Sequence, residues 1–185
     1  PAAIAATLDG YLDGAEILPG LDRKMLSEVR AIHILACGTS YHAGMVARYW
    51  IEALAGIPVM VEIASEYRYR TPAVPDGTLM LAISQSGETA DTLAALELAS
   101  DRRYLGRLAI CNVPESAMTR VCDHVLMTRA GLEIGVASTK AFTTQLTVLL
   151  LLSAALAREN GLAPDKLREV TESLGEVVQE AREVL

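Results

Sequence analysis

Residues 31–40, Ala31-Ile-His-Ile-Leu-Ala36 followed by Cys37-Gly38-Thr39-Ser40, decide how this chain folds. The first six residues form a short apolar run rich in branched side chains, which predicts a buried strand. The next four combine a glycine with hydroxyl side chains, which predicts that the strand stops at a turn. Because helical spacing follows from Tyr41 to Leu54, the predicted unit is a strand, a turn and a helix.

The same unit recurs along the chain. Four more apolar runs predict strands, at Val59–Ile63, Thr78–Ser84, Arg107–Cys111 and His124–Met127. The segments between and after them predict helices, at Thr89–Ser100, near Ser116–Arg120 and at Thr139–Arg158. Buried strands that alternate with helices indicate an α/β protein whose parallel sheet is covered on both faces. Five strands in 185 residues suit the flavodoxin-like order 2-1-3-4-5.

Helices are also expected before and after this region. Amphipathic spacing predicts them at Ile4–Leu12 and Leu21–Val29, and a last helix is predicted from Pro164 to Val184. We therefore divide the chain into a helical lead-in at 1–30, an α/β domain at 31–160 and a C-terminal helix at 161–185. Since the first residue is Pro1 and not methionine, we expect the chain to be a piece of a longer protein.

Composition limits the partners and the compartment. A net charge of −7 argues against nucleic acid or an anionic membrane as the main partner. The longest apolar run, Leu146–Ala157, is shorter than the roughly 20 residues of a spanning helix, so we expect no membrane partner. The 3 cysteines show neither a CxxC motif nor metal-ligand spacing, so no metal site is expected. Free thiols fit a reducing cytoplasm.

Two turns that share a chemistry are expected to meet at one end of the sheet. In the order 2-1-3-4-5, the first and third strands are neighbours, and ligands bind between their carboxyl ends. Gly38-Thr39-Ser40 follows the first strand, Ser84-Gln85-Ser86-Gly87-Glu88-Thr89 follows the third, and both open helices. Helix N-termini and hydroxyl groups suit an anion, and neither turn contains lysine or arginine. Helix capping alone would explain one such turn. Two such turns at this position predict a site that binds an anion through uncharged hydrogen-bond donors.

A third segment, Gly131–Ala141, follows the fifth strand and opens the long helix at Thr139–Arg158. Ser138 and Thr139 are expected to cap that helix. The preceding residues are numerous enough to fold back over the crevice. There Val136 and Ala137 would present backbone groups to sugar hydroxyls, and Ser138 its side chain.

Four motifs resemble the isomerase region of the glucosamine-6-phosphate synthases, the isomerising glutamine–fructose-6-phosphate aminotransferases. They are Ala36–Tyr41, Glu62–Glu66 with Arg68-Tyr-Arg70, Ser84–Thr92 and Gly135–Gln145. The chain is most similar to the first of the two sugar isomerase (SIS) subdomains of that family, whose sheet is flavodoxin-like. The resemblance implies a sugar phosphate ligand, fructose 6-phosphate or glucosamine 6-phosphate, and no cofactor. It assigns the phosphate to Ser84, Gln85, Ser86 and Thr89, and the sugar chain to Thr39, Val136 and Ser138, with Ser40 and Ala137 beside them.

The resemblance also places the chemistry outside this chain, so we expect no catalytic residue here. In the family, the general base lies in a second SIS subdomain, a histidine comes from a neighbouring subunit, and a glutaminase domain supplies nitrogen. The local alternatives are weak: His33 and His124 are expected to be buried or at a sheet edge, and His42 structural or solvated. Glu88 is interpreted as an acid in the first turn of its helix. Glu133 is the acidic residue whose position would best allow contact with the sugar.

Two function classes stay open. The first is an enzyme part that holds the substrate, and the resemblance then implies a homodimer. The charged segment with Glu66, Arg68 and Arg70, beside the second strand, is either its interface or a solvated face. The second class is a sensor module that binds a phosphosugar without turning it over.

Overall fold

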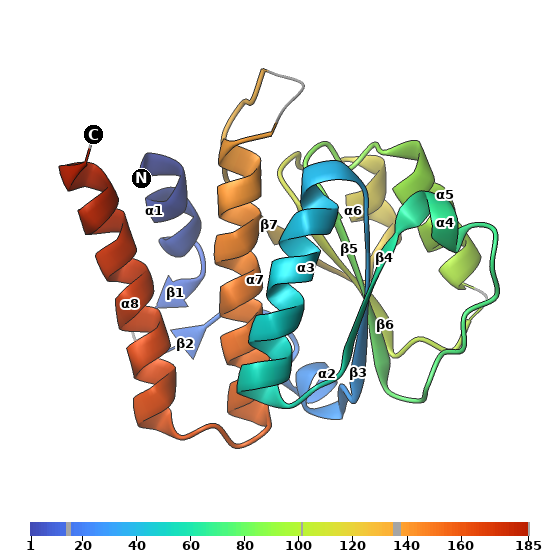
Figure 1. The fold of residues 1–185 in the computed structure, drawn as a ribbon, viewed down its shortest axis with the longest axis horizontal. Coiled ribbons are helices and arrows are strands. Elements are labelled where there is room, and N and C mark those ends of the chain that lie inside the picture. The colour runs from blue at the N-terminus through green and yellow to red at the C-terminus, as the bar shows by residue number, and fades with distance from the viewer. Residues whose placement is uncertain (14–15, 101, 135–137, 185) are drawn as a thin grey trace.

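The computed structural model describes residues 1–13, 16–100, 102–134 and 138–184, and its centre is a parallel sheet (Figure 1). The sheet has five strands, β3 (Ala31–Ala36), β4 (Val59–Ile63), β5 (Thr78–Ser84), β6 (Gly106–Cys111) and β7 (His124–Met127). They lie in the order β4-β3-β5-β6-β7, and every pairing is parallel. This is the expected order 2-1-3-4-5, so the α/β fold class is confirmed.

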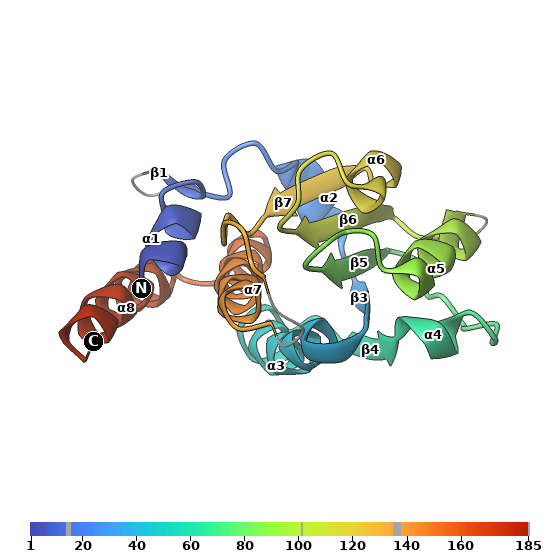
Figure 2. The ribbon, with the colours of Figure 1, turned by 90° about the horizontal axis from the view of Figure 1, so that it is seen from above.

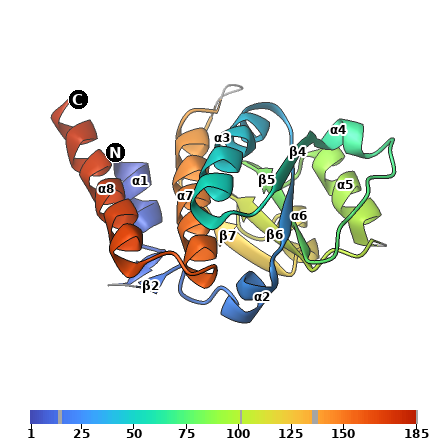
Figure 3. The ribbon, with the colours of Figure 1, turned by 60° about the horizontal axis from the view of Figure 1, so that its bottom comes forward.

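Helices cover both faces of the sheet, as the alternating pattern predicted (Figure 2). One face is covered by α3 (Gly38–Ala55) and α7 (Lys140–Glu159), and the other by α4 (Ala64–Tyr67), α5 (Ala90–Ser100) and α6 (Ala117–Val121). Beyond α7 lie α1 (Ala2–Leu8) and α8 (Pro164–Glu183), which make an additional outer layer. The short helix α2 (Arg23–Glu28) lies near the end where the sheet strands begin, opposite the loops that follow β3 and β5 (Figure 3).

The core consists of two apolar clusters, one on each face of the sheet. Ile34 and Ile83 belong to the cluster under α3 and α7, while Leu35 and Ala82 belong to the cluster under α4, α5 and α6. All four side chains are buried, because successive residues of a strand point to opposite faces and both faces are covered. Gly44 lets α3 approach the sheet, since a Cβ there would lie 2.9 Å from Ile34 Cγ2.

The N-terminal segment differs from the prediction. Instead of one helix over Ile4–Leu12, α1 ends at Leu8 and a short antiparallel pair follows, β1 (Leu12–Asp13) with β2 (Glu16–Ile17). Beside them, Tyr11 Oη accepts a hydrogen bond from the backbone N–H of Met127, and Thr7 donates to the carbonyl of Thr128. These contacts satisfy backbone groups in and just after β7, which would otherwise lie at an open sheet edge.

The longest apolar helix, α7, is a core element. By length and composition alone it could cross a membrane, although the apolar run in the sequence is interrupted. In the structure, however, 72% of its apolar window is buried against α1, α3, α8 and the sheet. Its apolar surface is therefore accounted for by packing within the domain.

Candidate functional site

A polar cleft of about 370 Å³ lies at the carboxyl ends of β3 and β5. Its size is within the usual range of small-molecule sites. The cleft brings together the turn after β3, the loop after β5 and the start of α7, and its lining residues are Cys37, Gly38, Thr39, Ser40, Ile83, Ser84, Gln85, Ser86, Thr89, Glu133 and Ser138. Seven predicted site residues thus meet in one place. The other two, Val136 and Ala137, lie outside the described residues.

The loop after β5 holds its hydroxyl groups in a donor arrangement. Ser84 Oγ accepts a hydrogen bond from the backbone N–H of Gly87 at 3.0 Å and pairs with Thr89 Oγ1 at 3.0 Å. Ser86 Oγ accepts from the backbone N–H of Glu88 at 3.2 Å. A hydroxyl that accepts from the protein can still donate its own proton, and in the Ser84–Thr89 pair one proton is used between the two groups while the other stays free. The loop therefore offers O–H donors at the N-terminus of α5, where unpaired backbone N–H groups also gather.

Backbone hydrogen bonds hold the other side of this loop to the end of β6 and to α6. The carbonyl of Gln85 accepts from the backbone N–H of Asn112 at 3.2 Å, and that of Gly87 accepts from Met118 at 3.0 Å. Gly87 has a φ of +67°, and a Cβ on it would lie 2.7 Å from Cys111 Sγ and closer still to Ser116. Glycine is therefore required here both by the backbone conformation and by the close approach to α6.

Glu88 has a different role from the one predicted. Its carboxylate accepts from the backbone N–H of Ala117 at 2.8 Å and so complements the N-terminus of α6, not that of its own helix α5. Sequence spacing could not show this, because the two groups are 29 residues apart. The Glu88 carboxylate is therefore directed away from the cleft. Inside the cleft it would repel a bound anion.

The turn after β3 contributes one exposed and one buried hydroxyl group. Thr39 is exposed, whereas Ser40 is only 6% exposed and lies in the first turn of α3. Ser40 Oγ accepts a hydrogen bond from Nε2 of Gln145 on α7, at 3.0 Å. No role was predicted for Gln145 from the sequence, although a glutamine within an apolar helix is a signal that could have been followed.

Glu133 caps α7, a role that the sequence analysis gave to Ser138 and Thr139. Its carboxylate accepts from the backbone N–H groups of Thr139, Lys140 and Ala141 and from Ser138 Oγ, at 2.7–3.3 Å. Thr139 stands at the N-cap position without a side-chain capping bond. Burial acts to raise the pKa of Glu133, but these hydrogen bonds outweigh it and hold the pKa below its ordinary value. Glu133 is therefore an ionised structural cap at the rim of the cleft.

The cleft offers hydrogen-bond donors but no cationic side chain among the described residues that line it. Of these lining residues, Glu133 is the charged one. Positive potential comes instead from the N-termini of α3 and α5. No cluster of three or more potential metal-ligating side chains occurs in the part of the chain that the structure describes. An anion with several oxygens is the ligand that such a donor set suits best.

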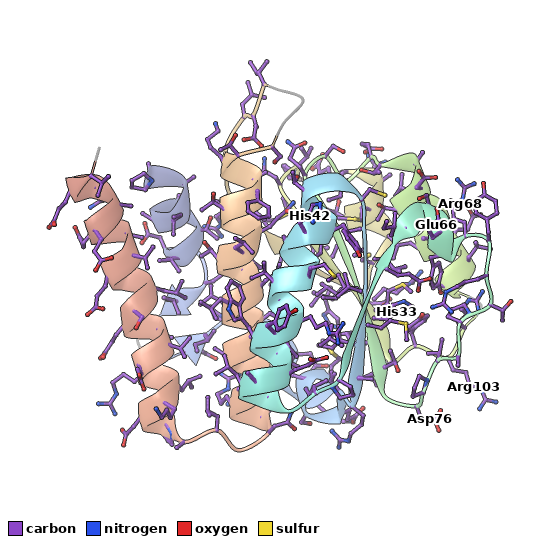
Figure 4. All side chains as sticks on the ribbon, viewed as in Figure 1. His33, His42, Glu66, Arg68, Asp76 and Arg103 are labelled. Carbon is purple, nitrogen blue, oxygen red and sulfur yellow. The ribbon has the colours of Figure 1, made fainter. Side chains whose placement is uncertain are left out.

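None of the three histidines lines the cleft. Figure 4 shows His33 on the sheet and His42 on α3. His33 is buried in the sheet, where Nε2 lies 2.8 Å from Glu62 Oε2 and Nδ1 2.8 Å from Tyr104 Oη. Burial lowers the pKa of His33, against the opposing effect of Glu62, so the imidazole is neutral in the folded protein. His42 is exposed on α3 and His124 is half-buried on β7. The predictions of buried or solvated histidines are therefore confirmed.

The charged segment after β4 is held by ion pairs across the surface. Arg68 Nη1 lies 2.7 Å from Asp91 Oδ1 on α5, and Arg70 Nη2 lies 2.7 Å from Glu62 Oε2 on β4. Glu66 is exposed. None of these groups lines the cleft, so the segment is a surface feature at the β4 edge of the sheet.

Comparison with known proteins agrees with this geometry. Residues 25–155 match the SIS domain family. The chain is 61% identical over 167 residues to the glutamine–fructose-6-phosphate aminotransferase (isomerizing) of Escherichia coli strain K12, an alignment that covers 88% of this chain and 27% of that protein. The enzyme of the same name from Legionella pneumophila strain Lens is 56% identical over 173 residues, covering 91% and 28%.

A solved structure is similar over nearly the whole chain. The C-terminal domain of glucosamine-fructose-6-phosphate aminotransferase from Francisella tularensis has a TM-score of 0.92 and 47% identity, and the match covers 96% of this chain and 50% of that one. The chain thus spans about a quarter of the length of the curated relatives that it matches, at 27–28%, and half of the solved domain.

Proposed function

The chain belongs to the SIS domain family, and we propose that its cleft binds a sugar phosphate, fructose 6-phosphate or glucosamine 6-phosphate. We further propose that the chain is the sugar-phosphate-binding half of the isomerase region of a glutamine–fructose-6-phosphate aminotransferase, which makes glucosamine 6-phosphate from fructose 6-phosphate and glutamine. The names of the relatives support this assignment and favour it over a sensor module.

One observation carries the proposal. Ser84 and Ser86 both accept hydrogen bonds from backbone N–H groups of their own loop, so the proton of Ser86 and one of the two protons of the Ser84–Thr89 pair remain available at the N-terminus of α5. Several donors converging on one point, with a helix dipole behind them, match the oxygens of a phosphate group. Gln85 and Thr89 line the same part of the cleft and add to the donor set. The turn with Thr39 and Ser40 would then contact the sugar, together with Val136, Ala137 and Ser138.

We propose that this half holds the substrate and does not transfer the proton. Isomerisation moves a proton between C1 and C2, which requires a base within hydrogen-bond reach. Glu133 is poorly suited, because four hydrogen bonds stabilise its ionised form and lower its pKa. His42 does not line the cleft. The catalytic groups would come from a second SIS domain, and the nitrogen from a glutaminase domain, in a longer parent protein.

We also propose where the protein is located, how it assembles and how the chain divides into domains. We place the protein in the cytoplasm, consistent with the free thiols of Cys37, Cys111 and Cys122, with neither nucleic acid nor a membrane as partner. A homodimer is proposed through the isomerase region, where Met60 and Tyr69, at and near the β4 edge, are exposed. The lead-in at 1–30, the SIS domain at 31–160 and the C-terminal helix at 161–185 are the proposed divisions.

Calorimetric titration with fructose 6-phosphate tests the binding function, with fructose as the control that lacks phosphate. Saturable binding of the phosphate ester with little binding of fructose is expected. Equal affinities for the two sugars would refute a phosphate site in this cleft.

Hydrogen exchange tests whether this chain binds the substrate without transferring the proton. The chain is incubated with fructose 6-phosphate in deuterated water, and exchange of the C1 hydrogens is followed by NMR. We expect exchange near the uncatalysed rate, because positioning without a base leaves the proton transfer uncatalysed. Fast exchange that Glu133→Gln abolishes would show that the base lies within this chain.

A further inference from the structure

Gln145 is a buried polar residue in the apolar contact between two helices. It lies on the second turn of α7, where that helix packs against α3, and it is 1% exposed. Its Nε2 donates to Ser40 Oγ at 3.0 Å, across a sequence separation of 105 residues. Among the described residues its other amide atom, Oε1, is buried and has no hydrogen-bond partner.

This arrangement is unfavourable for packing alone. A buried acceptor without a partner destabilises the fold, and leucine would fill the same helix face without that penalty. The neighbouring buried positions Val148 and Leu149 are apolar, and the buried hydroxyl groups of Thr144 and Thr147 donate to backbone carbonyls of α7 itself. Gln145 differs from them because its Oε1 is left without a partner, and such a side chain next to a binding cleft indicates a constraint other than stability.

The contact decides what Ser40 offers to the cleft. A serine hydroxyl has one proton and two lone pairs, and the amide of Gln145 occupies a lone pair. The proton of Ser40 is then free, and the side chain lines the cleft. Ser86 follows the same pattern, since it accepts from the backbone N–H of Glu88 and keeps its proton for a ligand. In the loop after β5, the group that donates to Ser86 is a backbone N–H, whereas the group that donates to Ser40 is a side chain of another helix.

We propose that Gln145 is a positioning residue of the sugar-phosphate site. By donating to Ser40, it turns the Ser40 hydroxyl proton into the cleft, where that proton is donated to an oxygen of the bound sugar phosphate. The inference rests on the proposed function and deepens it, because it names the group that fixes one donor in the sugar part of the site. Gln145 touches Ser40 and does not line the cleft itself.

A double-mutant cycle tests the coupling between the two residues. Calorimetric titrations with fructose 6-phosphate are made with the unchanged chain, Gln145→Met, Ser40→Ala and the double variant. Methionine fills a similar volume without the amide. Each single variant is expected to bind about 2- to 12-fold more weakly, the loss of one neutral hydrogen bond. The double variant is expected to bind no more weakly than Ser40→Ala, because Gln145 acts through Ser40.

Gln145→Glu gives a readout that a purely structural role would not change. An ionised carboxylate accepts the Ser40 proton and withdraws it from the cleft, whereas a protonated carboxyl group can donate to Ser40 as the amide does. Burial raises the pKa of a carboxyl group into the experimental range. The affinity of Gln145→Glu, divided at each pH by that of the unchanged chain, is therefore expected to rise as the pH falls from about 8 to about 5. The ratio cancels the ionisation of the phosphate itself.

The outcomes separate this inference from the proposed function. If the unchanged chain does not bind fructose 6-phosphate, both are overturned. If it binds but Gln145→Met binds equally well, or if the losses of the two single variants add in the double variant, the inference alone is overturned. A ratio for Gln145→Glu that does not change with pH also overturns it. Should Gln145→Met fail to fold, the pH series with Gln145→Glu decides.

Discussion

Removing the two hydroxyl groups that meet in the loop after β5, by Ser84→Ala with Thr89→Val, is expected to weaken sugar-phosphate binding strongly. Both substitutions keep the shape of the side chains closely and remove only oxygen atoms or replace them by a methyl group. The two oxygens lie 3.0 Å apart and both residues line the cleft. The double variant therefore removes one connected pair of donors from the proposed phosphate site.

The magnitude follows from the charge of the ligand. A hydrogen bond to a charged group contributes about 1.5–3 kcal/mol, which corresponds to roughly 10- to 150-fold in affinity. Because the two hydroxyl groups contact each other, their contributions do not add, so we expect a loss within this range. Stability should fall as well, since the backbone N–H of Gly87 loses its acceptor, Ser84 Oγ, at a cost of about 1–3 kcal/mol.

The measurement is a calorimetric titration with fructose 6-phosphate, and urea unfolding reports the stability of the same samples. Ser100→Ala is the matched control, because Ser100 Oγ donates to the carbonyl of Glu97 at the opposite end of the same helix, α5. The control should bind as the unchanged chain does. Unchanged affinity in a folded Ser84→Ala, Thr89→Val variant would remove this loop from the binding site and refute the reasoning.

Three further predictions concern stability. Gly87→Ala should lower the free energy of unfolding and abolish binding, because the added Cβ meets Ser116 and the residue has a φ of +67°; normal urea unfolding with normal titration would contradict this. Glu133→Gln should destabilise the chain at pH 7 but little at low pH. The folded-state pKa of Glu133 is lowered, so its contribution is complete above the unfolded carboxyl pKa and is lost as pH falls through the folded value; urea midpoints at several pH values check the sign. Tyr104→Phe should lower the free energy of unfolding by about 1–3 kcal/mol, because neutral His33 loses the hydroxyl that bonds its Nδ1, and titration should show unchanged affinity since neither residue lines the cleft.

The strands and the location of the cleft were predictable because their signals are local. The runs that form β3 and β5 end at turns marked by glycine and hydroxyl residues, at Gly38 and Gly87, so the position of these strand ends can be predicted from neighbouring residues. Once the strands are parallel and separated by helices, few sheet orders remain, and the observed order brings the turns after β3 and β5 together.

The N-terminal pair β1–β2 was missed because two-residue strands have no periodicity to detect. The helix predicted over Ile4–Leu12 fails for a tertiary reason: Tyr11 is held by its hydrogen bond to Met127, 116 residues away. A local pattern carries no information about a partner at that distance.

By itself, then, the sequence determined the five strands of the sheet, the helices that cover it, the order of the strands, and which turns lie together at the cleft. Only the tertiary structure decided which polar groups pair there: Glu133 with the N-terminus of α7, Glu88 with that of α6, and Gln145 with Ser40. The physical reason is the distance along the sequence over which each interaction acts. Backbone conformation and burial depend on residues a few positions apart, whereas a hydrogen bond between side chains depends on where two distant segments have packed, to within about half an ångström.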